Sequence, residues 1–309
     1  MSRRASKLYD LVNVSDPQAV IAEIVYILGL MLPDYNPAAI ESLYNDIVDL
    51  FKGRYPGYRA SNTKYHDLEH TNAVAVAVAR LMHGCSAGNT AHIGREELFP
   101  GIAAALFHDV GLIQTANDRE GSGAKYTIGH EKRSIAFMKQ YLRAGGYAAE
   151  TITDCAHLIM CTNLNLPISD ICFRTPRMTL LGKIVGSADL LAQIADRYYL
   201  EKLLLLFEEF EEAGVPGFNT EIDLLKKTES FYRDVARKRL NVDFSGVAAC
   251  MKFHFQARWG LKKDLYAQSI DNNIRYLKSI LRQSNDNLSA FRENLRRGKI
   301  AANRMDRPT

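Results

Sequence analysis

Two histidines four positions apart are the first residues in this sequence that could do chemistry. His66 and His70 belong to residues 65–70, Tyr-His-Asp-Leu-Glu-His. If this segment is helical, both imidazoles project from the same face. Imidazole nitrogens bind divalent metals, and they accept or donate protons near neutral pH. The pair therefore indicates a metal site, a proton-transfer site or both.

Two aspartates lie inside strongly apolar runs. Asp109 follows His108 directly, and Asp189 lies far along the chain in Ser-Ala-Asp-Leu. A buried carboxylate is costly unless a cation, a hydrogen-bond cluster or a metal accompanies it. Ion pairs with basic residues such as Arg133 or Lys183 are the simpler explanation. Two imidazoles and two carboxylates on otherwise apolar segments favour a divalent-metal site.

The His108-Asp109 doublet restricts where its helix ends. Adjacent residues in a regular helix point about 100° apart. Both side chains can reach one point only if they lie at a helix end. Gly111, two positions later, is the residue expected just past such an end.

The elements that must position these residues are all predicted to be helices. Alternating alanine and valine after His70 could indicate a strand, but the pattern continues at helical spacing on both sides. No other stretch alternates in the manner of a strand, so we predict an all-α fold. The predicted helices cover about 17–31, 38–51, the double histidine to 82, 96–109, 127–142, 148–161, 176–196, 198–212, 220–240, 246–256, 261–281 and 284–297.

We predict one all-α domain over residues 1–309, because no linker divides the chain and 309 residues can bury a large core. Within it, the metal-site core covers about 60–210 and a C-terminal helical extension covers about 211–297. A basic tail follows at 298–309.

The composition is that of a soluble globular protein. Hydrophobic residues make up 47% and charged residues 24%, and a net charge of +4 does not by itself indicate nucleic acid. Five cysteines without CxxC spacing indicate reduced thiols. The polar N-terminus lacks the form of a signal peptide, and no run spans a bilayer. We therefore expect a cytoplasmic protein with no membrane partner and no nucleic-acid partner.

The ordered set His70, His108-Asp109 and Asp189 resembles the ligand pattern of the HD superfamily of metal-dependent phosphohydrolases. Its cyclic-nucleotide phosphodiesterase branch is closest. Residues 65–70 are similar to the Tyr-His-Asn-x-x-His segment of that branch. Residues 159–164 resemble its Leu-Ala-Thr-Asp-Met stretch, and residues 187–190 resemble its Cys-Ala-Asp-Leu stretch. The resemblance covers about 64–210 and implies a multi-helix, HD/PDEase-like bundle with a buried metal site.

Carried onto this sequence, the resemblance implies that His70, His108, Asp109 and Asp189 bind one divalent metal. Asp109 would also bridge to a second ion, and His66 would be the general acid. Hydroxide generated at the metal would attack phosphorus while His66 protonates the leaving oxygen. The cofactor would be one or two ions of Mn, Fe, Zn or Mg.

The sequence also departs from the family pattern. The phosphodiesterase branch has a further histidine where this chain has Leu112, so a single metal is an alternative to two. His130 is placed like a histidine that other branches use at the second metal or in its outer shell. The alternative is that His130 is exposed and Glu131 caps its helix.

The expected ligand is a small phosphorylated molecule, in particular a nucleotide. Candidate substrate-binding residues are Gln193, one turn beyond Asp189, and the cations Lys125 and Arg133. The expected reaction is phosphodiester cleavage in a cyclic or other small nucleotide. The alternatives are a nucleotide phosphomonoesterase of the same superfamily and a non-catalytic nucleotide-binding signalling module.

Overall fold

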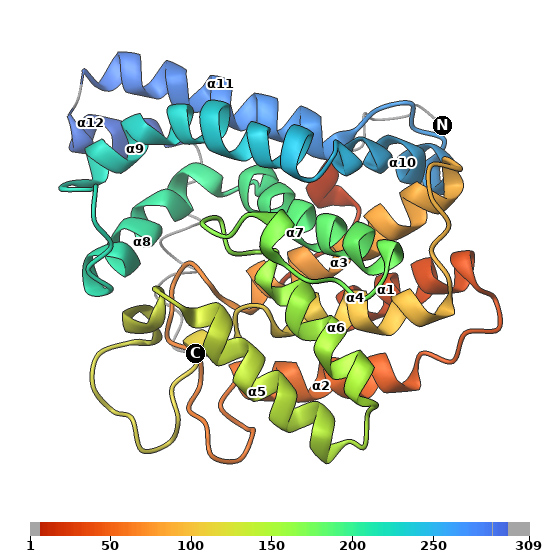
Figure 1. Cartoon of the computed structure of the whole chain (residues 1–309). Coiled ribbons are helices and arrows are strands. Elements are labelled where there is room, and N and C mark those ends of the chain that lie inside the picture. The colour runs from red at the N-terminus through yellow and green to blue at the C-terminus, as the bar shows by residue number, and fades with distance from the viewer. Residues whose placement is uncertain (1–6, 286, 296–309) are drawn as a thin grey trace.

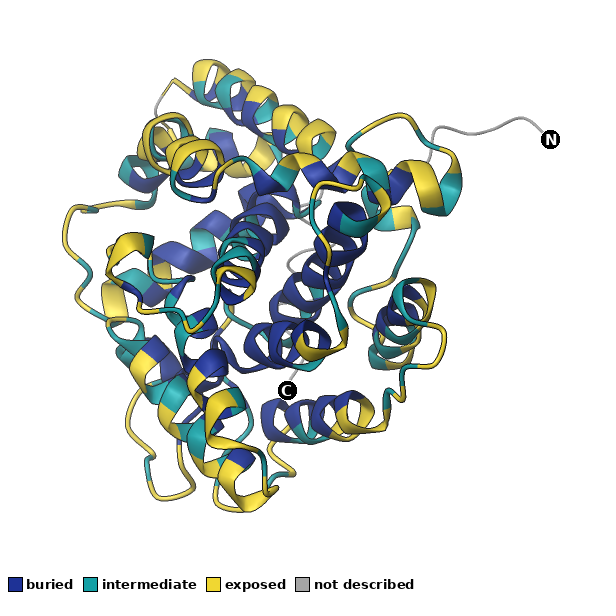
Figure 2. Cartoon of the chain, turned by 45° about the vertical axis from the view of Figure 1, so that its right-hand side comes forward, coloured by how far each residue is buried: buried dark blue, intermediate teal, exposed yellow. Residues whose placement is uncertain are grey.

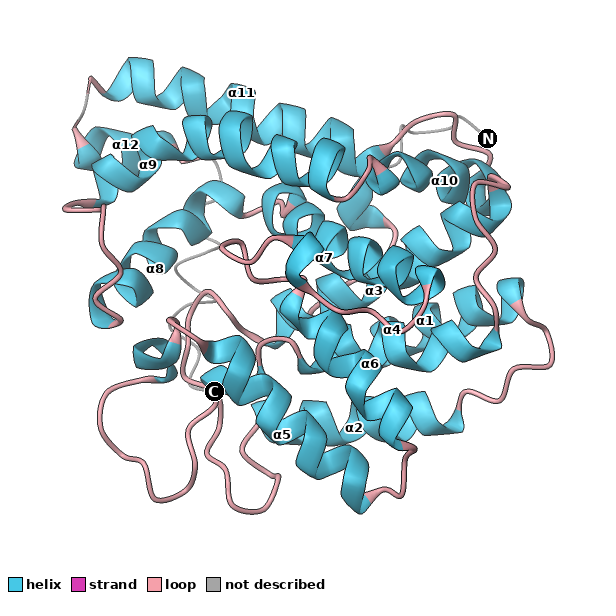
Figure 3. Ribbon diagram, viewed as in Figure 1, coloured by secondary structure: helices cyan, strands magenta, loops and turns pink. Residues whose placement is uncertain are grey.

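The computed structural model describes residues 7–285 and 287–295, and these form helices joined by loops (Figures 1 and 3). Within these ranges there is no β-strand, only isolated bridges between Lys52 and Ala60 and between Tyr58 and Thr115. The prediction of an all-α fold is confirmed. The predicted basic tail at 298–309 lies outside the described residues.

Twelve α-helices make up the described part of the chain. They are α1 (Pro17–Met31), α2 (Ala38–Phe51), α3 (Leu68–Ala87), α4 (Arg95–Phe107), α5 (His130–Ala144), α6 (Ala149–Met160), α7 (Pro176–Ala195), α8 (Tyr199–Glu212), α9 (Glu221–Ser230), α10 (Met251–Trp259), α11 (Leu265–Ser284) and α12 (Leu288–Asn294). Short 3₁₀ turns and two π-helical segments, Phe231–Ala236 and Arg239–Asp243, join some of them.

Helices α3, α4 and α7 pack against one another at the centre of the fold (Figure 1). The run from Val74 to Cys85 is buried on every side, which explains why its apolar residues show no amphipathic pattern. Figure 2 shows the central helices as almost wholly buried. Gly84 in α3 allows close contact with the 3₁₀ turn that ends at Cys250. A Cβ on Gly84 would lie 2.2 Å from the carbonyl oxygen of Cys250.

Helix α7 is long and apolar enough to cross a membrane by length and composition alone. In the fold, 72% of its most apolar window is buried inside the protein. That burial is what a central helix of a helical domain shows.

One hydrophobic core extends from Val20 in α1 to Phe291 in α12. The C-terminal helices differ most from the predicted pattern. Where one helix was predicted over 220–240, the α-helical part ends at Ser230. Two π-helical segments follow it. The helix predicted to begin at 261 begins at Leu265, because the Asp264 carboxylate caps it by accepting from the Ala267 N–H.

Candidate metal centre

The first turn of α3 positions His70 and leaves His66 outside the helix. Asp67 is the N-cap of α3, and its carboxylate accepts a 2.8 Å hydrogen bond from the His70 N–H. Aspartate is a strong N-cap because it pairs with a backbone donor that has no partner within the helix. The prediction that one helix carries both histidines is therefore wrong. His66 lies in the bend that precedes α3.

The end of α4 positions the His-Asp doublet as predicted. Helix α4 ends at Phe107, His108 is its C-cap, and Asp109 has φ −108° and ψ 0°. This sparsely populated backbone region is common among active-site residues. A 3₁₀ turn containing Gly111 follows, so the chain turns away at the position that the sequence indicated.

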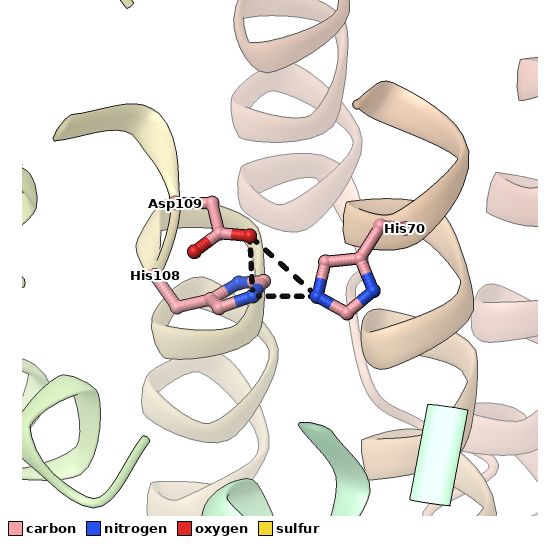
Figure 4. Close-up of side chains that lie close together, drawn as sticks. All are labelled: His70, His108 and Asp109. Carbon is pink, nitrogen blue, oxygen red and sulfur yellow. Dashed lines mark hydrogen bonds and ion pairs between the residues drawn. The ribbon is translucent and has the colours of Figure 1, made fainter. Parts of the chain in front are cut away.

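The side chains of Asp109 and of both helix-borne histidines point toward one another (Figure 4). The Nε2 atoms of His70 and His108 are 3.3 Å apart, and His108 Nε2 is 3.1 Å from Asp109 Oδ2. From α7, Asp189 places Oδ1 3.2 Å from His70 Nε2 and 3.8 Å from His108 Nε2. Ligand atoms that surround a divalent ion at bond lengths of about 2.0–2.2 Å lie roughly 3–3.5 Å apart.

The hydrogen bonds around this cluster fit a bound cation. Nδ1 of His108 lies 2.8 Å from the Ala105 carbonyl oxygen and must donate to it, which leaves Nε2 of the neutral ring with a lone pair. That lone pair faces Asp109 Oδ2, a buried atom with no aligned hydrogen-bond donor in the described structure. Converging imidazole and carboxylate lone pairs are the donor set of Mn, Fe and Zn sites. The residues present therefore fit a divalent metal.

The pKa values of His108 and Asp109 indicate that the cluster favours positive charge between the imidazole nitrogens and the carboxylate oxygens. Burial disfavours the charged form of His108, but Asp109 more than offsets this and raises the pKa of His108 to about 9. Burial would raise the pKa of Asp109, yet His108 and His130 hold it well below its usual range. A site that stabilises imidazolium in its interior also stabilises a cation in that place.

His130 faces the other oxygen of the Asp109 carboxylate. Its Nε2 lies 3.3 Å from Asp109 Oδ1, while its Nδ1 donates to the Thr127 carbonyl at 2.8 Å. The His130 side chain is 15% exposed, so the alternative of an exposed histidine does not describe it. Asp109 thus presents one oxygen to His70 and His108 and the other to His130. A carboxylate that bridges two ions has this arrangement.

A buried glutamate holds His66. Nδ1 of His66 lies 2.6 Å from Glu209 Oε2, and Glu209 Oε1 accepts a 2.6 Å hydrogen bond from the Tyr65 N–H. Burial lowers the pKa of His66, but Glu209 outweighs it, so the pKa is raised. The His66 ring is centred 5.9 Å from that of His70 and 6.2 Å from that of His130.

Glu209 is a site residue that was not predicted from the sequence. A signal for it was present, because Glu209 follows Leu205 and Leu206 by four and three positions in α8. It therefore continues the buried stripe of that helix, where a solvated glutamate would not be placed. In the structure it is 3% exposed.

A cavity of about 950 Å³ opens from this centre, and His66, His70, Asp109 and Asp189 line one end of it. Gln193 lines the same cavity, and its side chain is hydrogen-bonded to that of Tyr65.

The structure does not bring the two predicted cationic substrate contacts into this cavity. Lys125 pairs with Asp118 at 2.6 Å, and Arg133 donates to the Gly111 carbonyl at 2.7 Å. The Arg133 guanidinium also lies 3.5 Å above the ring of Tyr126. Both cations stabilise the loop between α4 and α5.

Fold and site together define a helical protein whose clustered histidines and aspartates could hold a metal ion. The chain matches the model of the Npun_R2479-like family over residues 40–245, and it belongs to that family. The matched region contains every residue of the cluster, together with His66 and Glu209. No curated protein matches the chain.

Proposed function

We propose that the protein is a metal-dependent phosphohydrolase of the HD type that cleaves a phosphodiester. The observation that carries the proposal is the convergence of His70, His108, Asp109 and Asp189 beside His66, in which each histidine Nε2 lies 3.1–3.8 Å from the other and from an oxygen of each aspartate. His66 is a mostly buried imidazole that is not one of the four proposed ligands, so it is free to transfer a proton.

These four residues would hold the metal, and His130 with the second oxygen of Asp109 would hold another ion. A divalent cation there supplies Lewis acidity, which ionises water at neutral pH and stabilises charge on phosphorus-bound oxygens. The protein supplies the proton. With Nδ1 of His66 bonded to Glu209, Nε2 is the ring atom left to protonate the departing oxygen. Glu209 fixes the ring orientation and stabilises the imidazolium.

The charge of the cavity supports a diester more than a monoester. Besides its histidines, the lining contains two lysines, Lys132 and Lys227, and no arginine, as far as the structure describes the chain. A phosphomonoester dianion is usually bound by arginine or lysine clamps, whereas a diester carries a single charge. The resemblance of residues 65–70 and 187–190 suggests a cyclic or other small nucleotide as the substrate.

The test is hydrolysis of bis-p-nitrophenyl phosphate against p-nitrophenyl phosphate with Mn²⁺, together with metal analysis. We expect faster turnover of the diester and loss of both metal and activity in Asp109→Asn. His66→Gln should keep its metal and lose at least 100-fold in kcat. The matched control is Asp34→Asn at a surface aspartate that is 79% exposed. An Asp109→Asn protein that keeps metal and activity would refute the assignment.

A further inference from the structure

The cavity that begins at the metal centre changes character along its length. Part of its wall comes from α8 and from the segment 215–235, where leucine, valine and phenylalanine side chains line it beside Tyr199, Lys227, Thr228, Ser230 and Asp234. Phe210 and Phe218 stack there, with ring centroids 5.5 Å apart. We call this part the apolar arm, defined by Leu206, Phe210, Phe218, Leu224 and Phe231.

Exposed hydrophobic side chains also line the cavity. The described residues include six large hydrophobic side chains that are exposed, and three of them line this cavity. These are Ile128, Leu164 and Val235, which are 67%, 40% and 37% exposed and come from three distant segments. An apolar part of a ligand bound in the cavity would cover these exposed side chains.

The polar groups of the arm do not suit a highly charged ligand. Lys227 donates to the Gly217 carbonyl and lies 5.5 Å from the Phe218 ring centroid, so its ammonium group is held against the wall. Asp234 at the rim pairs with its neighbour Arg233 at 2.7 Å. Apart from its histidines, the described lining offers a nucleoside di- or triphosphate two cations, Lys132 and Lys227, and no arginine.

Part of the wall has unusual backbone geometry. Phe231, Asp234 and Val235 belong to the π-helical segment Phe231–Ala236, which directly continues α9. π-helical turns are rare and occur frequently at functional sites. The volume of about 950 Å³ lies at the upper end of the range typical of small-molecule pockets.

We propose that the apolar arm binds a long aliphatic chain of the substrate, so that the substrate class is a phosphodiester with one aliphatic ester group. This inference rests on the proposed function, because it places the phosphorus at the metal end and the chain along the arm. It names a different substrate class from the nucleotide that the sequence resemblance suggests.

Binding tests the arm without turnover. Alkylphosphonates from methyl to octyl, kept below their micellar concentration, are titrated into the Mn²⁺-loaded protein by calorimetry. Each buried methylene should lower Kd about fourfold, and the heat-capacity change should become more negative with chain length. Equal affinities across the series would overturn the inference.

Two surface variants provide a matched comparison. Ile128 and Val242 are both β-branched and are 67% and 66% exposed, but only Ile128 lines the cavity. Ile128→Ser should flatten the dependence of Kd on chain length for the longer phosphonates, whereas Val242→Ser should keep the wild-type slope. An identical slope in both variants would contradict the predicted path of the chain.

Turnover separates this inference from the proposed function. Methyl and octyl p-nitrophenyl phosphate share one leaving group, and we expect kcat/KM to be at least tenfold higher for the octyl ester. If neither ester nor any cyclic nucleotide is hydrolysed by metal-loaded protein, the proposed function fails. If the methyl ester or a cyclic nucleotide is hydrolysed faster than the octyl ester, the proposed function stands and the apolar-chain inference fails.

Discussion

Gly111 offers the sharpest test of how the fold holds the metal centre. It lies between the His-Asp doublet and α5, where its N–H donates to the Ser134 hydroxyl at 2.8 Å. The same hydroxyl donates to the His108 carbonyl at 2.6 Å. A Cβ at this position would lie 2.1 Å from the His130 carbonyl oxygen and 2.7 Å from the Ser134 nitrogen. Both are backbone atoms, so no rotamer change can relieve the contact.

The cost of Gly111→Ala follows from these distances. Real Cβ atoms do not approach other heavy atoms within 3.0 Å, so α5 must move by about an ångström. Overpacking of this kind costs up to roughly 3 kcal/mol. Alanine has fewer backbone states than glycine in the unfolded chain, and this stabilises the folded state by about 0.4–1 kcal/mol. We expect the free energy of unfolding to fall by about 2 kcal/mol.

The assay is urea denaturation of metal-free and Mn²⁺-loaded protein. The matched control is Gly29→Ala in α1, where the helix is exposed and an added Cβ has no neighbour within 4 Å. That control should gain about 0.5–1 kcal/mol from higher helix propensity. Gly111→Ala should also bind fewer Mn²⁺ ions, because the displacement carries His130 away from Asp109. A Gly111→Ala protein as stable as the wild type, with unchanged metal content, would refute the reasoning.

Two further changes test individual side chains. Glu209→Gln should move the basic limb of the pH–rate profile to lower pH, because Glu209 raises the pKa of His66. The control Glu208→Gln changes an exposed neighbour and should leave the profile unchanged. His254→Leu tests stability against pH. Burial, with Arg80 and His83, lowers the pKa of His254 to about 2, so the unfolded chain takes up the proton first as pH falls below about 6.5. Stability of the metal-free wild type should therefore decrease by up to about 1.4 kcal/mol per pH unit from this group alone, and His254→Leu should remove that part of the slope. A Glu208→Gln shift equal to that of Glu209→Gln, or a His254→Leu slope equal to that of the wild type, would contradict these assignments.

The sequence predicted the helices that carry the centre because their apolar patterns are long and their ends carry recognisable signals. Thr175-Pro176 before α7 and Gly111 after the doublet are such signals. The error at His66 has a local cause. Spacing of four suggested one helix, but the Asp67 carboxylate competes for the backbone N–H of His70 and starts the helix later.

The remainder of the site depends on contacts between segments far apart in the chain. Glu209 contacts His66 although the two residues are 143 positions apart in the sequence, and no local pattern specifies that pairing. The cavity depends on how α8 and the segment 215–235 pack around the candidate metal centre. Helical periodicity indicates which face is apolar, but not whether that face closes on a neighbour or lines an open space. The phenylalanines at 210 and 218 could therefore be assigned to the core from sequence alone and still line a pocket.

The origin of the four donors has a consequence for the lifetime of the protein. His70, His108 and Asp189 come from α3, the end of α4 and α7, three helices that already pack together. A cation shared by them would cross-link distant parts of the chain in the way a disulfide does, and saturation at 100 times Kd would add about 2.7 kcal/mol to global stability. If the proposed metal binds there, metal starvation would expose the chain to proteolysis, and cellular abundance would follow metal supply.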